Sequence, residues 1–199
     1  GPDPASINAA MIGGIAANNA SGMCCGTAQN SYNTLESMQV ILYDGTLLDT
    51  GNKKSVSSFN KSHKALILRI SELYQKINSD NELASLIRHK YKMKNTTGYS
   101  LNSFVDFSNP IDIIQHLMIG SEGTLGFISE ITYRTVLEAP HKASALILFQ
   151  NMRDACNAVF TLKKQAVDAV EIMDRAALRS VENKEGMPEY LKTLGESVT

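Results

Sequence analysis

Hydrophobic and polar residues alternate along the chain with two different periods, and a change of period separates expected strands from expected helices. Two apolar runs, residues 38–43 and 46–49, flank Asp44 and Gly45. Asp-Gly between apolar runs predicts a β-hairpin, because the type I′ turn requires positive φ at both central residues. Residues 127–137 alternate again and predict a further strand.

Between the hairpin and this strand, the spacing of apolar residues becomes helical. Apolar side chains recur every three or four positions over residues 61–78 and 81–91, which predicts two successive helices. The side chains expected to face the core are Leu66, Ile70, Leu73, Tyr74 and Ile77 in the first helix and Leu83, Leu86 and Ile87 in the second.

A long loop separates these helices from a shorter one. Residues 92–109 are polar and rich in turn formers, a composition typical of loops that are functional or mobile. Asn109 and Pro110 then favour a helix start, because Asn caps the first N–H groups and Pro fits the first helical position. We therefore expect a short helix that begins at Pro110.

The last third of the chain shows a β-α-β-α order after Pro140. Apolar runs at residues 143–149 and 166–173 predict strands, and the segments that follow them predict helices over residues 151–164 and from Asp174 onward. Such an alternation after a proline break is typical of the start of another domain.

Composition and charge narrow the class of protein. The net charge of −1 argues against a nucleic-acid partner, because phosphate binding rests on a clustered basic excess. Three cysteines, two of them adjacent, are a poor disulfide framework, and no histidine lies near them, so no metal site is predicted. No apolar run approaches the roughly 18 residues of a membrane span. We expect a cytoplasmic protein, or one bound peripherally at the inner membrane.

Small residues dominate two stretches that lie far apart in the sequence. They are residues 1–31, rich in Gly, Ala, Ser and Asn, and the run from Gly120 to Gly126. Small side chains let the backbone approach another group closely, and N–H groups at such turns bind the anionic diphosphate of a dinucleotide. Neither stretch has the spacing of a Rossmann fingerprint or of a P-loop. Each alone is as consistent with a structural turn as with a phosphate site.

Taken together, three motifs resemble the FAD-binding domain of the vanillyl-alcohol oxidase / p-cresol methylhydroxylase (PCMH) family. In chain order they are residues 2–6 (PDPAS), 12–22 (IGGIAANNASG) and 120–128 (GSEGTLGFI). Within that family they are most similar to FAD-linked D-lactate and D-2-hydroxyglutarate dehydrogenases. The segment 91–99 resembles that of the longer bacterial members, which continue into an iron–sulfur region.

The resemblance implies an α+β fold in two parts. Residues 1–138 would form the second subdomain of a PCMH-type FAD-binding domain, a mostly antiparallel sheet with helices. The first subdomain, with another glycine loop for the diphosphate, is expected to precede Gly1. Residues 139–199 would begin a ferredoxin-like substrate-binding domain. Because half of the cofactor cradle would then be missing, the 199 residues alone are expected to bind FAD weakly and to be inactive.

The resemblance also implies where FAD is bound. The loop at residues 4–6 and the segment 13–22 would hold the diphosphate and ribityl chain, and residues 122–128 would line the flavin or the adenosine side through main-chain groups. The residues implied to bind the cofactor are Pro4, Ala5, Ser6, Gly13, Gly14, Ala17, Asn18, Asn19, Ser21, Gly22, Glu122, Gly123, Thr124, Leu125, Gly126 and Ile128.

Several of these side chains have a structural interpretation as well. Asn18 and Asn19 add hydrogen bonds to the cofactor or cap a turn. Ser21 and Thr124 donate to phosphate or to a nearby carbonyl. Glu122 hydrogen-bonds a ribose or braces its own loop.

Other chemically active side chains are given structural roles. Cys24 and Cys25 are interpreted as small buried residues rather than sites of covalent flavin attachment. His116 is interpreted as a structural residue on a helix face, and the basic residues within 88–94 as a solvated helix end. Asp174 caps a helix or helps to orient a substrate carboxylate.

The resemblance implies an FAD-dependent dehydrogenase that oxidises a D-2-hydroxyacid, such as D-lactate, to the 2-oxoacid. A base would take the hydroxyl proton while hydride passes to the flavin, and the electrons would go on to a quinone, a cytochrome or an iron–sulfur partner. In relatives the base lies mostly in the substrate domain, so no residue of this chain is assigned as catalytic. The alternatives are a flavoprotein that acts on another alcohol or on an alkyl-glycerone-phosphate type of substrate, and a module that catalyses nothing.

Overall fold

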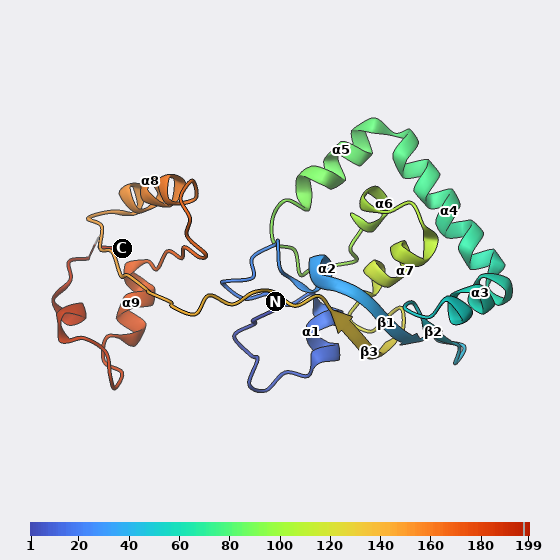
Figure 1. Ribbon diagram of the computed structural model, residues 1–199. Helices are drawn as coiled ribbons and strands as arrows, with labels where there is room; N and C mark the ends of the chain where they lie inside the picture. Colours follow the sequence, from blue (N-terminus) through green and yellow to red (C-terminus); the bar gives the residue numbers. More distant parts are fainter. Residues whose placement is uncertain (197) are drawn as a thin grey trace. The chain divides into compact units, whose positions relative to one another are not determined.

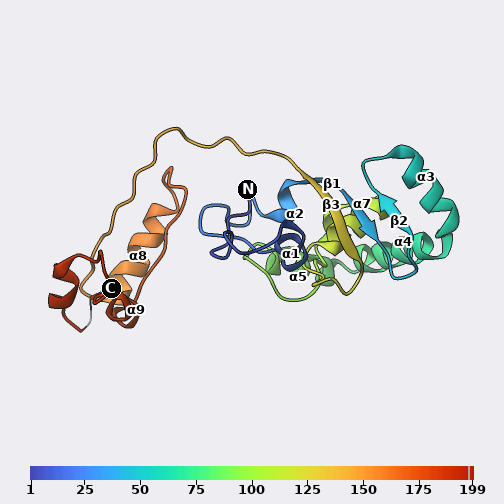
Figure 2. The same ribbon diagram turned by 90° about the horizontal axis from the view of Figure 1, so that it is seen from below.

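The computed structural model describes residues 1–196 and 198–199, which divide into two compact units, residues 1–137 and 138–199 (Figure 1, Figure 2). The first unit combines helices with a three-stranded antiparallel sheet of order β2-β1-β3. The expected α+β class with an antiparallel sheet is therefore confirmed.

The first unit contains ten elements within the described residues. They are α1 (Ile12–Asn18), α2 (Ser31–Thr34), β1 (Leu35–Ile41), β2 (Leu47–Asp49), α3 (Lys53–Ser62), α4 (Lys64–Ser79), α5 (Asn81–Lys90), α6 (Ser103–Asp106), α7 (Pro110–Met118) and β3 (Phe127–Tyr133). The second unit contains α8 (Met152–Leu162), α9 (Arg175–Val181) and the 3-10 helix η1 (Glu189–Thr193). None of the described helices combines the length and the apolar composition that crossing a membrane requires.

The hairpin between β1 and β2 confirms the expected strand pairing but not the expected turn. The N–H of Leu42 donates to Thr46 O at 2.9 Å, so three residues connect the strands. Gly45 has a φ of 82°, whereas Asp44 does not share a positive φ. A type I′ turn is therefore wrong here, since it needs two such residues, and a glycine at the last position of a three-residue loop replaces it.

The core of the first unit lies between the sheet and α7. Val40 of β1 and Leu48 of β2 are buried against Ile113 of α7, and these three side chains are at most 1% exposed. Helix α7 also contacts α4 and α6, so nearly every side is covered, and such a helix is apolar almost all round. Its start is as expected, with Asn109 Oδ1 accepting from Ile111 N at 2.9 Å and Pro110 in the first turn. The burial of α7 fixes the position of the loop that follows it.

The helical region before α7 begins earlier than the apolar spacing predicted. Asn52 Oδ1 accepts from Lys54 N at 2.9 Å and starts α3, whose only fully buried side chain is that of Phe59. A helix with one anchor shows little periodicity, which is why the sequence pattern missed it. At the break between α3 and α4, the His63 ring stacks on Phe59 with centroids 4.3 Å apart, and its Nε2 lies 3.0 Å from Asp44 Oδ2. This contact ties the helix break to the hairpin turn.

Helices α4 and α5 bury a narrower strip than expected. Ile70 and Ile87 are buried, with exposed fractions of 7% each, and Ala84 is buried in place of its leucine neighbours. Helix α4 contacts α5, α6 and α7, and α5 contacts α4 and α6 (Figure 1), while the positions that flank these contacts are accessible. The leucines expected inward that are instead exposed are Leu66, Leu73, Leu83 and Leu86.

The second unit has the expected helices but not the expected strands. Asn151 Oδ1 accepts from Asp154 N at 3.0 Å and Asp174 Oδ1 from Ala177 N at 2.7 Å, so both predicted caps are confirmed. Within the described residues, neither 143–149 nor 166–173 is a strand. A strand needs a partner for its N–H and C=O groups, and the pairing seen here is a single exchange between Phe149 and Thr199.

Candidate functional site

The two small-residue stretches meet in the first unit. Gly120 donates its N–H to Ala16 O at 3.2 Å, and Glu122 donates its N–H to Ala17 O at 2.9 Å. Asn18 Nδ2 donates to Glu122 Oε1 at 2.5 Å. These bonds attach the end of α1, which also contacts β3, to the loop between α7 and β3 (Figure 1). Segments far apart in the sequence therefore form one continuous backbone surface.

Left-handed backbone shapes both sides of this junction. Helix α1 ends at Asn19, whose φ is 53°, and the chain reverses there through the bond from Ala20 N to Ile15 O at 2.9 Å. On the other side, Glu122 and Gly123 have φ values of 52° and 76°. A left-handed non-glycine residue costs roughly 1–2 kcal/mol, and such outliers gather at functional sites. The hydrogen bond from Asn18 helps to hold Glu122 in this conformation.

The glycines of the second stretch serve two different needs. A Cβ on Gly126 would lie 2.8 Å from Val40 Cγ1 and 3.1 Å from Ile41 O, so this glycine is required for packing against β1. A Cβ on Gly120 would lie 3.3 Å from Gly98 O. Gly123 has a positive φ, and a Cβ there would meet nothing within 4 Å. Its backbone is the open part of the loop and is accessible to a ligand.

The N-terminal loop is attached to the first stretch through Asp3. The two carboxylate oxygens of Asp3 accept from Cys24 N and Cys25 N, each at 3.2 Å, and Ile7 N donates to Pro4 O at 2.9 Å. Burial raises the pKa of the Asp3 carboxyl, but the hydrogen bonds from Cys25 and Cys24 outweigh it and leave this pKa below 3.8. Pro4 is buried while Ala5 and Ser6 are exposed. The loop of residues 4–6 thus lies next to residues 22–25.

Three buried polar atoms around this junction have no hydrogen-bond partner in the described part of the chain. They are Asn19 Oδ1, Ser21 Oγ and Ser121 Oγ, and their residues are 8%, 8% and 2% exposed. An unpaired buried polar group costs about 1–3 kcal/mol. The two hydroxyls can donate to phosphate oxygens, and the amide oxygen can accept from a sugar hydroxyl. This set of groups fits the phosphate and polyol parts of a dinucleotide.

A third segment, which sequence reasoning did not place at the site, lies across both stretches. Lys94 Nζ donates to Ser21 O at 2.6 Å, and Asn19 Nδ2 donates to Asn95 O at 3.4 Å. The Tyr99 hydroxyl lies 2.9 Å from Thr124 Oγ1. Lys94 is exposed, as expected for the basic residues of 88–94, but its bond to Ser21 O is a contact that their interpretation as a solvated helix end did not include. The turn-rich composition of 92–109 was the available signal.

The other candidate residues of the sequence have structural surroundings. Cys25 is buried as expected, but Cys24 is exposed, and it is joined to Asp3 through its main-chain N–H alone. Leu125 and Ile128 are partly buried, and their side chains pack against the hydrophobic core. His116 is buried, and its ring stacks on Phe107 with centroids 4.0 Å apart, which confirms its structural role.

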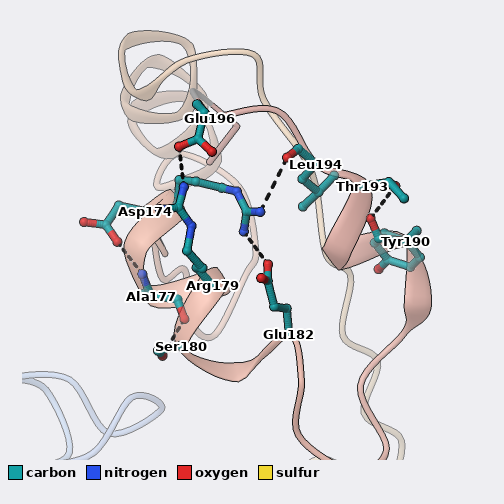
Figure 3. A network of polar contacts seen from close by, with 10 residues as sticks. Asp174, Ala177, Arg179, Ser180, Glu182, Tyr190, Thr193, Leu194 and Glu196 are labelled. Atoms are coloured by element: carbon teal, nitrogen blue, oxygen red, sulfur yellow. Dashed lines mark hydrogen bonds and ion pairs between the residues drawn. The ribbon is translucent and has the colours of Figure 1, made fainter.

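In the second unit, Asp174 and Arg175 are used within the protein. Figure 3 shows this network, in which Asp174 Oδ1 caps α9 through Ala177 N. Arg175 NH1 lies 2.9 Å from Glu182 Oε2, and the two side chains are only 10% and 14% exposed. Arg175 NH2 also donates to Leu194 O at 3.4 Å. The Asp174 cap thus stabilises the start of α9, the ion pair of Arg175 with Glu182 joins its two ends, and the bond from Arg175 to Leu194 O connects α9 to the segment after η1.

Acid should destabilise the first unit through His116. Burial lowers the pKa of His116 below its ordinary value of 6.5, although Asp112, whose carbonyl lies 2.7 Å from Nδ1, opposes this. The unfolded chain therefore binds the proton first, so stability is complete above pH 6.5 and falls as the pH drops through the folded-state pKa. Urea unfolding at a series of pH values between 7.5 and 5 should show this loss in the wild type and a smaller one in His116→Asn. Equal pH dependence of the two proteins would exclude this role.

Comparison with known proteins finds two domain families and several relatives to which the chain is similar. Residues 1–51 match the FAD binding domain model, and residues 138–198 match the model for the C-terminal domain of FAD linked oxidases. A D-lactate dehydrogenase of Anaerostipes hadrus is 35% identical over 104 residues, which are 51% of this chain and 19% of that protein. A D-lactate dehydrogenase of Archaeoglobus fulgidus is 25% identical over 93% of this chain and 30% of its own length.

A third relative has a related name. A D-2-hydroxyglutarate dehydrogenase of Haemophilus influenzae is 25% identical over 89% of this chain and 18% of its own length. The chain thus spans no more than 30% of the length of the relatives it matches. The two domain matches and these relatives show that the chain is similar to FAD-linked oxidases of the D-lactate dehydrogenase type, a class whose cofactor is FAD.

Proposed function

We propose that the protein works as an FAD-dependent dehydrogenase that oxidises a D-2-hydroxyacid, such as D-lactate, to the 2-oxoacid. The observation that carries the proposal is the backbone junction between residues 13–22 and 120–126, made by the bonds from Gly120 N to Ala16 O and from Glu122 N to Ala17 O. A surface with few side chains suits close approach by a dinucleotide. The names of the relatives support a hydroxyacid as substrate.

Within this proposal, different residues of the junction bind different parts of the cofactor. The loop of Pro4, Ala5 and Ser6 and the segment from Gly13 to Gly22 would hold the diphosphate and ribityl chain, with Ser21 Oγ donating to it. Asn19 Oδ1, unpaired within the described residues, would accept from a sugar hydroxyl. The positions proposed to contribute through main-chain groups are Glu122, Gly123, Thr124, Leu125, Gly126 and Ile128.

Bound FAD would supply the redox chemistry by accepting a hydride from the carbon that carries the substrate hydroxyl. The protein would position the two reactants, exclude water and take up the hydroxyl proton on a base. We assign that base to no described residue. The electrons would leave through a quinone, a cytochrome or an iron–sulfur partner, and a quinone acceptor would place the protein at the inner membrane rather than in the cytoplasm.

Reduction of the flavin by the two stereoisomers of one substrate tests the proposal. The protein expressed from its complete reading frame should be yellow, and its absorbance near the flavin maximum should bleach without oxygen on addition of D-lactate or D-2-hydroxyglutarate. L-lactate, which has the same charge and size, should leave the spectrum unchanged.

Each other outcome of this experiment contradicts the proposal in a different way. Bleaching by another alcohol or by an alkyl-glycerone phosphate, and by no D-2-hydroxyacid, would favour the alternative flavoprotein. A colourless protein that binds no added FAD would favour a module without catalytic function. Equal bleaching by D- and L-lactate would contradict the proposed specificity for the D-isomer.

A further inference from the structure

We propose that residues 91–100, which we call the strap, form a third side of the cofactor site and that Lys94 is the cation that binds the diphosphate of FAD. This inference rests on the proposed function and adds to it a residue outside the two small-residue stretches. Its basis is the bond from Lys94 of the strap to Ser21 O, next to polar groups that lack partners within the described residues.

The strap is held in place at its own ends. The Tyr91 hydroxyl donates to Tyr99 O at 2.6 Å and accepts from Leu101 N at 3.1 Å, which closes the segment into a loop. Ser100 Oγ donates to Ile119 O at 2.6 Å and joins the strap to the end of α7. Because these hydrogen bonds hold both ends of the strap, its residues have a defined position in the structure.

The strap contacts both small-residue stretches as well as the core. Asn95 O accepts from Asn19 Nδ2 in the first stretch, and the Tyr99 hydroxyl contacts Thr124 Oγ1 in the second. Gly98 O lies so close to Gly120 that a Cβ there would be 3.3 Å away. A ligand that lies across the junction of the two stretches is therefore bordered by the strap.

Lys94 carries a positive charge that the described part of the protein does not neutralise. Its ammonium group has three N–H donors, and one of them is used by Ser21 O. No ion pair of Lys94 occurs among the described residues. The nearby acids have other partners, since Asp3 accepts from Cys24 and Cys25, and Glu122 accepts from Asn18. Two donors of Lys94 are thus available to an anion.

The unpaired hydroxyls are a second, independent observation, and they indicate that the ligand carries hydrogen-bond acceptors. Ser21 Oγ and Ser121 Oγ are both more than nine-tenths buried and have no partner within the described residues. Ser21 is the residue whose carbonyl Lys94 contacts, so a cation and an unused donor occur at one point of the site. A diphosphate is anionic and rich in acceptor oxygens, and it matches this combination.

Binding measurements on variants of Lys94 test the inference with a signal other than activity. The Kd of the complete protein for FAD would be measured by quenching of flavin fluorescence in the wild type, Lys94→Met and Lys94→Arg. We expect the Kd to rise about ten- to hundredfold in Lys94→Met and to rise less in Lys94→Arg, which keeps the charge. Lys92→Met is the matched control, because Lys92 is exposed in the same strap, as Lys94 is, but its ammonium group makes no hydrogen bond or ion pair within the described residues, and its Kd should stay within about twofold.

Riboflavin, which has the ring but no phosphate, separates a diphosphate contact from a general effect on the fold. Lys94→Met should leave the Kd for riboflavin unchanged and should reduce the salt dependence of FAD binding. Melting of the FAD-free variants would be followed in parallel. If Lys94→Met does not fold, Lys94→Gln against Lys94→Arg gives the same comparison with a polar side chain.

The two proposals fail in distinguishable ways. If the wild type binds FAD and Lys94→Met binds it with the same Kd, the role of Lys94 is excluded and the proposed function stands. The same conclusion follows if Lys94→Met raises the Kd for riboflavin as much as the Kd for FAD. If the wild-type protein binds neither FAD nor riboflavin, the proposed function fails and this inference fails with it.

Discussion

Replacing Gly22 with alanine should detach the N-terminal loop from the candidate site. A Cβ on Gly22 would overlap the carbonyl oxygen and the carboxyl group of Asp3, and the carbonyl is backbone that cannot rotate away. Residues 1–6 would have to move, which breaks the hydrogen bonds from Cys24 N and Cys25 N to the Asp3 carboxylate. Hydrogen bonds to a charged group contribute about 1.5–3 kcal/mol each, so we expect FAD affinity to fall by about a hundredfold.

Hydrogen exchange and thermal unfolding measure this effect directly. In Gly22→Ala, the amides of Cys24 and Cys25 should lose their protection, and the melting temperature should fall. Gly14→Ala is the control for stability, because a Cβ on Gly14 would meet nothing within 4 Å, and alanine favours the helix there. Unchanged protection of the two amides in Gly22→Ala would show that the loop accommodates the side chain.

Replacing Phe59 with alanine should cause the largest loss of stability. Phe59 is 2% exposed and is the one buried side chain of α3, and it also stacks on His63. Removing a buried phenylalanine costs about 3–5 kcal/mol, a large part of the roughly 5–15 kcal/mol that stabilises a typical domain. Without this anchor, α3 and the contact from His63 to Asp44 have little to hold them against the hairpin.

The free energy of unfolding, measured by urea titration with circular dichroism, tests this prediction. Phe127→Ala is the matched control, since Phe127 is 67% exposed at the start of β3. Its loss should stay below about 1 kcal/mol, mostly from the lower strand preference of alanine. Similar losses in both variants would show that burial of Phe59 does not anchor α3.

The hydrogen bonds that Asp44 accepts, first from Thr46 N and then from His63, give the hairpin turn its acid sensitivity. Hydrogen bonds from Thr46 and from His63 lower the pKa of the Asp44 carboxyl from 3.8 to about 2. Since the folded-state pKa is the lower one, the stabilising contribution is complete above pH 3.8 and is lost as the pH falls through about 2. The loss of this contribution begins below pH 3.8, whereas the loss from His116 begins below pH 6.5.

Features that depend on a few neighbouring residues were predictable from the sequence. The caps at Asn109, Asn151 and Asp174 are confirmed because each side chain bonds an N–H two or three residues ahead. The hairpin was recognised in the same way, although its turn has one left-handed residue instead of two. The α+β class followed from these elements and from the family resemblance.

Features that depend on a partner strand or on a neighbouring helix were not predictable in this way. Residues 143–149 and 166–173 are apolar enough for strands, but they lack a continuous hydrogen-bonded partner within the described residues. Leu83 and Leu86 have helical spacing, yet α5 packs through Ala84 and Ile87. An apolar pattern indicates that a face of a helix or strand can be buried, but the neighbouring elements determine whether that face is buried.

By itself, the sequence determined the two side-chain-poor stretches of the site and the helix cap at Asn109, which starts the helix before the second stretch. Only the tertiary structure decided that Ala16 and Ala17 receive the N–H groups of Gly120 and Glu122, and that Lys94 extends from the strap to Ser21. The reason is physical. Local hydrogen bonds are encoded within a few residues, whereas contacts across a hundred residues follow from burying α7 against the sheet, which sets where each loop lies.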